Sequence, residues 1–478
     1  MLEDYDITIG LEVHAQLDTD TKIFCSCSNE FGAEPNVHTC PVCLGLPGVL
    51  PVLNKKAVDY AVKAGLALNC DIATFSKFDR KNYFYPDLPK AYQVSQFDLP
   101  LCTDGYIDVE TENNEEAVRI SINRIHMEED AGKLVHSDSG DSLVDYNRVG
   151  TPLIEIVTEP DIHSPAQAIA YLKKLKSILE YLEVSNCNMA EGSLRCDANA
   201  SIKPKGAKEL GTKTELKNMN SFKAIEKGLK YEIKRQEKVL DSGEEVVQET
   251  RMWDANQERT FSMRGKEEAH DYRYFPEPDL VPMEVDKAWL EDIAETIPEL
   301  PAVRRKRFVA EFGLPEYDAE VLIDSKSVAD FFEATVEKHD DPKSVSNWIM
   351  GDLMRLLNEE DIEIDEAKVD PDGLANMLKL LDDDTISSKI AKTVFEEMFN
   401  TGKAPDTIVE EKGLKQISNE DELGNIVDKV IEENPDAVAD YQGGKDQAIG
   451  YLVGQIMKET RGKADPQLTN EMLREKLN

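Results

Sequence analysis

The sequence predicts an α+β protein in which a strand-rich first part is followed by helical parts. Residues 1 to about 293 contain all eight cysteines, most of the glycine and aromatic residues, and many segments in which apolar and polar residues alternate. From about residue 297 to 400, apolar residues recur instead at helical spacing. Asp324–Ser327, for example, supplies capping residues just before Val328 and Phe331. These two patterns predict a sheet followed by helices.

The composition predicts three domains, at residues 1–293, 294–402 and 403–478. The segment Asn400–Pro405 contains glycine and proline and is typical of a linker. The tail that follows it has helical spacing. A chain of 478 residues is long enough for this number of domains, each with its own apolar core.

Charge is the most unusual feature of the composition. The chain carries 94 acidic and 55 basic side chains, a formal net charge of -39, which argues against a broad surface for polyanions. The last part, from Tyr441 to Asn478, has a net charge of +1 and could let phosphate approach, although an ordinary pair of terminal helices is the competing interpretation. The overall acidity could also reflect a salt-adapted host.

No apolar run approaches the roughly 18–20 residues that span a bilayer, so no membrane partner is expected. The segment Met1–Asp6 is acidic and lacks the apolar region of a secretory signal, so we expect a cytoplasmic protein.

Four cysteines form two short pairs, Cys25 with Cys27 and Cys40 with Cys43. In a reducing compartment such pairs bring four thiolates to one tetrahedral zinc ion. Four thiolates fill the coordination sphere, so the zinc would be structural. A redox pair and unligated thiols are the alternative interpretations.

Two predicted strands carry dense rows of polar side chains. Alternation over Asp6–Leu17 places Glu12 and His14 on one face, opposite an apolar face. Alternation over Leu194–Ile202 likewise places Arg195 and Asp197 on one face, and residues 213–217 offer a third polar row. A solvated outer face explains any one row, whereas several rows together favour a lined cleft.

Two further segments carry carboxylates that need partners. Glu155 interrupts an apolar strand, where a lone carboxylate is costly unless it is paired with a cation or bound to a metal. Glu128 begins three consecutive acids before a turn, and such oxygen ligands suit Mg²⁺. The runs Asp79–Asp87 and Asp271–Pro276 interleave basic and aromatic residues, which suits base stacking or packing under a loop.

Several common catalytic motifs are absent from the sequence. It has no GxxxxGK[ST] phosphate loop, no HExxH and no GxSxG elbow. A nucleotide would therefore have to bind through a less common architecture.

These segments together resemble the B subunit of the tRNA-dependent amidotransferase, the GatB family, over essentially the whole chain. The matching stretches are Ile9–His14, Phe78–Asp87, His126–Lys133, Gly150–Ile156, Glu191–Asp197, Asp271–Leu280 and Gly450–Lys458.

The resemblance implies a cradle domain built on a mixed sheet, a helical domain and a small helical YqeY-like tail that contacts tRNA. It implies an ATP-dependent carbon–nitrogen ligase that works in a complex with an amidase (A) subunit and a small C subunit. ATP and Mg²⁺ would activate the side-chain carboxylate of Glu or Asp misacylated on tRNA(Gln) or tRNA(Asn), and ammonia from glutamine would then give the amide. The structural zinc occurs in only part of the family.

Site residues follow from the same resemblance. His14, Glu128 and Glu155 would hold Mg²⁺, with Glu12 as a nearby acid. Weaker candidates for contact with ATP or the acyl group are Lys81, Arg195 and Asp197. The basic residues of the tail that would touch tRNA are Lys445, Lys458, Arg461 and Lys463.

Two other functions remain open on the sequence. One is a non-catalytic RNA-binding scaffold with a merely structural acidic cluster. The other is a free-standing ATP-dependent amide ligase that uses ammonia directly.

Overall fold

The computed structural model describes residues 4–111, 117–136, 140–265, 272–416, 420–460 and 463–477. The chain divides into two compact units, Met1–Leu300 and Pro301–Asn478. The first unit is built on a large sheet and the second on helices, which confirms the α+β prediction.

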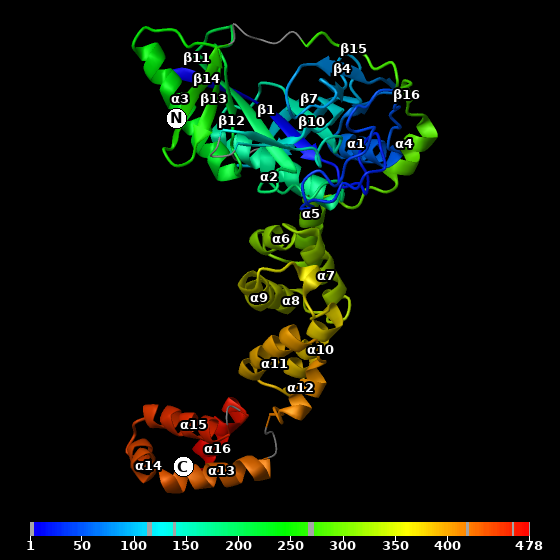
Figure 1. Ribbon diagram of the computed structural model, residues 1–478. Coiled ribbons are helices and arrows are strands. Elements are labelled where there is room, and N and C mark those ends of the chain that lie inside the picture. Colours follow the sequence, from blue (N-terminus) through cyan, green and yellow to red (C-terminus); the bar gives the residue numbers. More distant parts are fainter. Residues whose placement is uncertain are drawn as a thin grey trace. The chain divides into compact units, whose positions relative to one another are not determined.

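A nine-stranded sheet organises the first unit (Figure 1). Its order is β14-β13-β12-β11-β1-β10-β7-β6-β2. The strands are β1 (Tyr5–Gln16), β2 (Asp71–Ile72), β6 (Cys102–Val109), β7 (Val118–Glu129), β10 (Pro152–Thr158), β11 (Leu194–Pro204), β12 (Thr214–Lys217), β13 (Glu249–Asp254) and β14 (Arg259–Gly265). The β12–β13 pair is parallel and the other pairs are antiparallel, so the sheet is mixed as the resemblance implied.

The apolar face of this sheet carries the core. Ile9, Leu11 and Val13 of β1 are all buried on one side, as the alternation predicts. Their core also includes buried residues of the helices α1 (Lys55–Ala67), α2 (Pro165–Tyr181) and α3 (Phe222–Asp241). Covering one face with helices leaves the opposite face of the central strands for polar side chains.

Three small sheets complete the first unit. The first joins β4 (Asp79–Asn82), β5 (Tyr92–Ser95) and β15 (Phe275–Pro276). The others pair β3 (Phe75–Ser76) with β16 (Met283–Glu284), and β8 (Lys133–His136) with β9 (Ser142–Asp145). Helix α4 (Lys287–Ala294) packs on α1. Because β5 contacts β7 of the large sheet, residues of β4 come close to the polar face.

The second unit is helical and has two separate apolar clusters. Buried residues between Phe308 and Val409 form the first cluster, and buried residues between Leu423 and Leu477 form the second. The α-helices are α5 (Pro301–Phe312), α6 (Glu316–Leu322), α7 (Lys326–Val336), α8 (Pro342–Trp348), α9 (Met354–Glu360), α10 (Pro371–Asp382), α11 (Ser388–Thr401), α12 (Pro405–Glu411), α13 (Glu420–Glu433), α14 (Pro435–Gln442), α15 (Gln447–Glu459) and α16 (Pro466–Leu477). A π-helical turn, Ile349–Leu353, joins α8 to α9, and a short 3-10 helix spans Ile364–Glu366.

Helix α7 begins at Lys326 and buries Val328 and Phe331, as the sequence pattern predicts. The bounds of the three predicted domains stay predictions. Ile408 and Val409 of α12, which follow the predicted linker, pack in the first helical cluster.

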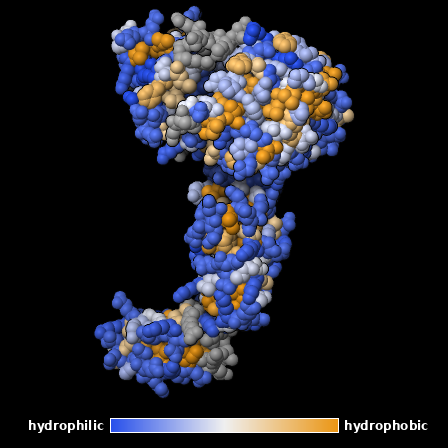
Figure 2. Space-filling view, in the orientation of Figure 1, coloured by the Kyte–Doolittle hydropathy of each residue, from blue (hydrophilic) through white to orange (hydrophobic). Residues whose placement is uncertain are grey.

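Hydrophilic side chains cover most of the face seen in Figure 2, with apolar patches between them. Within the described residues, no helix combines the length and apolar composition that a bilayer crossing requires.

Glu232 of α3 is a buried carboxylate that ties this helix to the sheet. It is 0% exposed and accepts hydrogen bonds from Thr214 Oγ1 at 2.8 Å and from Arg235 Nη2 at 2.7 Å. Arg251 Nε of β13 lies 3.4 Å from its other oxygen.

We predict that Glu232→Gln lowers the free energy of unfolding of the first unit by about 1–3 kcal/mol, because Arg235 and Arg251 lose their fully buried carboxylate partner and keep, among the described residues, only Glu249 as a counter-ion. Denaturant unfolding followed by circular dichroism measures the loss. The matched control is Glu226→Gln, which removes an exposed ion pair with Lys230 on the same helix and should change little. Equal stability of both variants would contradict this account.

Candidate functional site

The polar face of the three central strands gathers carboxylates and imidazoles. Strand β10 lies between β1 and β7, and Glu155 of β10 pairs in register with His14 on one side and with His126 on the other. Glu128 follows His126 by two residues and therefore points to the same face. The structure thus brings together His14, Glu128 and Glu155, the three residues predicted to hold Mg²⁺, and Glu12, the acid predicted beside them.

Short distances join these side chains. His14 Nε2 lies 3.2 Å from Glu155 Oε2, 3.5 Å from Glu128 Oε1 and 3.9 Å from Glu12 Oε1. His126 Nε2 lies 3.4 Å from Glu155 Oε2 and 3.8 Å from Glu128 Oε2. His126 was not among the predicted site residues. Its position two residues before Glu128 on a strand was the sequence signal that could have found it.

Burial gives this cluster strong electrostatic coupling. Glu128, Glu155 and His126 are each less than 7% exposed. Burial favours the neutral acid, but the hydrogen bond from His126 and the neighbouring charges hold the pKa of Glu128 and of Glu155 below the usual value. Burial opposes protonation of His126, yet its bonds to the two carboxylates raise its pKa to about 9. The carboxylates and imidazoles of the cluster therefore stabilise one another's charged forms.

The donor atoms suit a divalent cation. Two sets, Glu12 with His14 and Glu155, and His126 with Glu128 and Glu155, each have ligand atoms within 4.8 Å of one another. Carboxylate oxygens suit Mg²⁺ and Mn²⁺, and imidazole nitrogen suits later metals such as Fe²⁺ and Zn²⁺. The residues therefore fit a resident metal of this class.

Lys81 supplies a positive charge of the kind that a phosphate-binding site needs. It lies on β4, and the negative charges of Glu128 and Glu155 raise its pKa against the opposing effect of burial. Among the described residues, no carboxylate lies within 4.0 Å of its ammonium; instead, the ring centroid of Tyr272 is 5.0 Å away. The ammonium is therefore available to an anionic ligand.

Tyrosines from the second basic–aromatic run surround this lysine. Tyr272 packs edge-on against Tyr83 at 5.8 Å and against Tyr274 at 6.1 Å, and Tyr274 stacks on Phe97 at 4.2 Å. The pairing of β15 with β4 brings these tyrosines close to Lys81, although the two segments are almost two hundred residues apart in the sequence. The sequence singled out both runs but could not show that they meet; Asp271 of the second run lies outside the described residues.

Arg195 and Asp197 lie on β11, directly beside Glu12 and His14 of β1, but both are held in ion pairs. Arg195 Nη2 is 2.9 Å from the buried Asp130 Oδ2. Asp197 pairs with Lys217 of β12. Their predicted contact with ATP or the acyl group stays a prediction.

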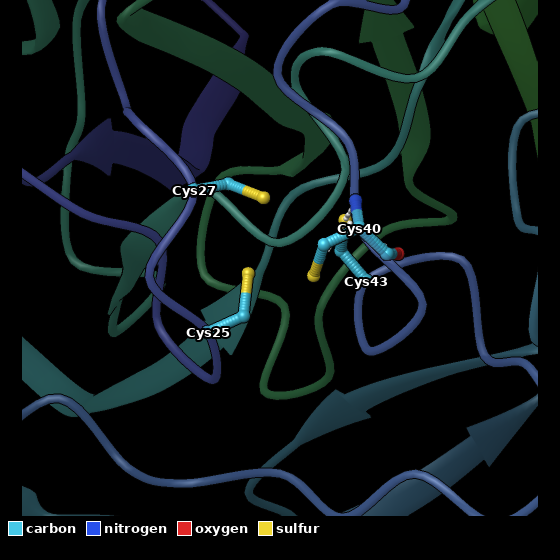
Figure 3. Close-up of side chains that lie close together, drawn as sticks. All are labelled: Cys25, Cys27, Cys40 and Cys43. Carbon is cyan, nitrogen blue, oxygen red and sulfur yellow. Dashed lines mark hydrogen bonds between the residues drawn. The ribbon is translucent and has the colours of Figure 1, made fainter.

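The four predicted zinc ligands come together in the structure. The sulfurs of Cys25, Cys27, Cys40 and Cys43 lie within 4.8 Å of one another and point toward a common centre (Figure 3). The hydrogen bond from Cys25, aided by the backbone of Cys40 and the charge of Lys22, lowers the pKa of Cys43 to about 5 against the effect of burial. Such a set fits a tetrahedral ion that binds thiolates.

A buried ammonium supports this sulfur set. Lys22 is 1% exposed, and its Nζ lies 3.9 Å from Cys43 Sγ and 2.6 Å from the His38 carbonyl. A positive charge in this position favours thiolate over thiol.

The predicted tRNA contacts lie on and around α15. Lys445 is paired with Asp440 at 2.8 Å. Lys458 is exposed, and no carboxylate of the described residues lies within ion-pair distance of it. Lys463 is partly buried, and Arg461 lies outside the described residues.

A mixed sheet that carries a carboxylate–imidazole cluster beside an available lysine defines a candidate metal-dependent group-transfer protein. Residues 7–291 match the GatB/GatE catalytic domain family, and residues 330–477 match the GatB domain family.

Three similar proteins match this chain over nearly its full length. The B subunit of the aspartyl/glutamyl-tRNA(Asn/Gln) amidotransferase of Caldanaerobacter subterraneus subsp. tengcongensis is 65% identical over 473 residues, covering 99% of each chain. The corresponding B subunit of Thermoanaerobacter pseudethanolicus is 63% identical over 473 residues, again 99% of each chain. The one from Carboxydothermus hydrogenoformans is 60% identical over 480 residues, covering 100% of this chain and 99% of its own. The chain belongs to the family of aspartyl/glutamyl-tRNA(Asn/Gln) amidotransferase B subunits, which confirms the resemblance.

Proposed function

We propose that this chain is the B subunit of a glutamine-dependent amidotransferase acting on Glu or Asp misacylated on tRNA. It uses ATP to phosphorylate the side-chain carboxylate and then amidates it with ammonia supplied by an amidase subunit. The names of the full-length relatives support the reaction class. The observation that carries the site is the cluster of His14, Glu128 and Glu155 on the polar face of the sheet.

The chemistry explains the residue types in the cluster. The substrate carboxylate is a poor electrophile, so its oxygen first bonds to the γ-phosphorus of ATP while ADP leaves. Ammonia then adds to the acyl carbon, phosphate leaves with the C–O bond pair, and the nitrogen loses a proton. Both steps bring anions together, so positioning and charge neutralisation dominate the barrier.

Each part of the cluster has a task in this scheme. His14, Glu128 and Glu155 would hold Mg²⁺, which when bound neutralises phosphate oxygens. The Lys81 ammonium supplies a second positive charge for the phosphate. Burial and the charge of Glu155 raise the pKa of Glu12, which suits its carboxylate for accepting the proton that the amine loses.

We predict that Glu155→Ala and Glu128→Ala each lower ATP-dependent phosphorylation by about a thousandfold or more, because several kcal/mol of charge stabilisation are lost. ADP formation by the assembled complex with misacylated tRNA measures the step. Complex assembly and tRNA binding should persist. The control is Glu258→Ala, an exposed acid on the turn between β13 and β14.

Normal transamidation by both cluster variants would contradict this assignment and favour the RNA-binding scaffold. Ammonia-dependent activity of the isolated chain, with no need for the A and C subunits, would favour the free-standing ligase.

We further propose that the four cysteines hold one structural zinc ion. The four sulfurs lie close to one another, and the buried Lys22 ammonium lies beside Cys43, which supports an anionic, metal-bound state. The turn after Cys43 is also specialised, because Gly45 has a φ of +66° and a Cβ there would collide with Lys90.

Metal analysis of the purified chain should give about one zinc per molecule. The double variant Cys40→Ser/Cys43→Ser should lose it, whereas Cys70→Ser, a buried thiol outside the set, should retain it. Full metal content in the double variant would contradict the zinc site.

We also propose that tRNA contacts the near-neutral tail. Lys458 is the best single candidate, since it is exposed and has no described ion-pair partner. The apolar residues of the tail form a cluster that is separate from that of the preceding helices, so the tail has its own core.

We predict that Lys458→Ala weakens binding of tRNA by the assembled complex and reduces the slope of log affinity against log salt by about one, as the loss of one phosphate contact requires. Glutamine hydrolysis by the partner should be unchanged. Lys429→Ala, which removes an exposed lysine already paired with Glu459, is the control. An unchanged slope would exclude Lys458 from the interface.

A further inference from the structure

Two arginines share one buried carboxylate, Asp130, which directly follows β7 at the edge of the polar face. Asp130 is 4% exposed. Its Oδ2 accepts hydrogen bonds from Gln16 Nε2 at 2.7 Å and from Arg195 Nη2 at 2.9 Å, and Arg148 Nε lies 3.4 Å from the same oxygen. Its Oδ1 accepts a hydrogen bond from the backbone N–H of Ala131 at 2.8 Å. The acid therefore has two cations close to it.

The two arginines are held in different ways. Arg148 is fixed on the turn after β7, because its Nε donates to the Ala131 carbonyl and its Nη2 to the Gly132 carbonyl, each at 2.9 Å. Arg195 contacts Asp130 through Nη2, and among the described residues its other donors have no partner. A guanidinium has five N–H donors, so most of those of Arg195 remain unused. Arg148 is thus an anchored cation, whereas Arg195 is bound at a single atom.

Arg195 can leave Asp130 without exposing an uncompensated buried charge. After its departure, Asp130 would keep the ion pair with Arg148 and the hydrogen bonds from Gln16 and Ala131. A buried acid that loses its only cation is strongly destabilised, and Asp130 avoids this because a second cation stays beside it. The anchored Arg148 therefore makes release of Arg195 possible.

The position of Arg195 suits an anion that binds at the cluster. Arg195 of β11 pairs in register with His14 of β1, and the two side chains share the polar face. Residues directly opposite each other in an antiparallel pair have Cβ atoms about 4.5–5.5 Å apart. The planar guanidinium matches the oxygens of a carboxylate or a phosphate. An anion held beside His14 is therefore a neighbour of Arg195.

We propose that Arg195 is an exchangeable anion-binding residue, which rests on Asp130 and transfers to the anionic oxygens of the substrate while Arg148 stays with Asp130. The oxygens are those of the side-chain carboxylate of the misacylated tRNA or of the phosphates of ATP. Arg195 touches the substrate, whereas Asp130 and Arg148 are positioning residues. The proposal rests on the proposed function, because that function supplies both anions.

Steady-state kinetics of ADP formation by the assembled complex test the binding role, with the KM of ATP and that of misacylated tRNA measured separately. Arg195→Lys keeps the charge and loses the planar fork. It should raise the KM of the ligand that Arg195 binds by about tenfold or more and change kcat less. The KM that rises identifies the source of the oxyanion, and an unchanged KM for both ligands would overturn the proposal. The control is Arg119→Lys, which alters an arginine of the same unit that pairs with Asp108.

The exchange is tested by changing the two groups that control Arg195. Arg148→Gln should raise the same KM by about fivefold, because Arg195 becomes the cation that Asp130 retains and is less often available. Adding Asp130→Asn removes the competing acid, so the double variant should return the KM to within about twofold of wild type. If Arg148 only supports the turn, the double variant stays as impaired as Arg148→Gln, since both lack the bonds to the carbonyls. That result would overturn the exchange.

The single variant Asp130→Asn gives a second test that does not need Arg148→Gln to fold. Both arginines are partly exposed, so they remain solvated without the acid. The KM should lie at or below the wild-type value, because Arg195 no longer has a competing partner. A KM raised as in Arg195→Lys would show that Asp130 holds Arg195 in its binding position, and would contradict the exchange.

Failure of this proposal differs from failure of the proposed function. Normal ADP formation by the wild-type complex, together with KM values that contradict the expected pattern, would remove the exchange and leave the proposed function intact. A wild-type complex that forms no ADP would contradict the proposed function. The same variants would then be compared by equilibrium binding of ATP and of misacylated tRNA, with the same changes expected in Kd.

Discussion

A carboxylate buried in the middle of the sheet, Glu155, is the group on which the rest of the site depends. An unpaired charge there would cost several kcal/mol, so its neighbours must neutralise it. The strand order supplies them, because β1 and β7 flank β10 and each places a histidine beside Glu155. The apolar face of the same strands fixes their register through the core, and that register fixes the distances in the cluster.

Alternation along single strands could be predicted from the sequence, and partners across strands could not. The local pattern predicts that Glu12 and His14 share a face and that Glu155 needs a partner. The structure has both features. The position of His126 two residues before Glu128 placed it on the same face, but its contact with Glu155 exists only through the pairing of β7 with β10, which no local pattern specifies. The approach of Tyr272 to Lys81 depends on the pairing of β15 with β4 and was invisible for the same reason.

The positively charged residues near the cluster differ in whether an ion pair already engages them. Arg195 forms an ion pair with the buried Asp130, and it would have to break this ion pair to bind substrate. Lys81 has aromatic neighbours in place of a carboxylate, which keeps its charge in position and available. In a protein of net charge -39, such a lysine is a local exception, as is the near-neutral tail. We propose that both are places where phosphate approaches a protein that is otherwise strongly acidic.

We propose that the phosphates of ATP meet a metal ion that His14, Glu128 and Glu155 would hold. Pulsed electron nuclear double resonance of the Mn²⁺-loaded complex, with a non-hydrolysable ATP analogue, tests it most directly. We expect phosphorus-31 hyperfine coupling to the bound Mn²⁺, because a phosphate oxygen would enter its coordination sphere. Bound Mn²⁺ with bound nucleotide and no phosphorus coupling would contradict it.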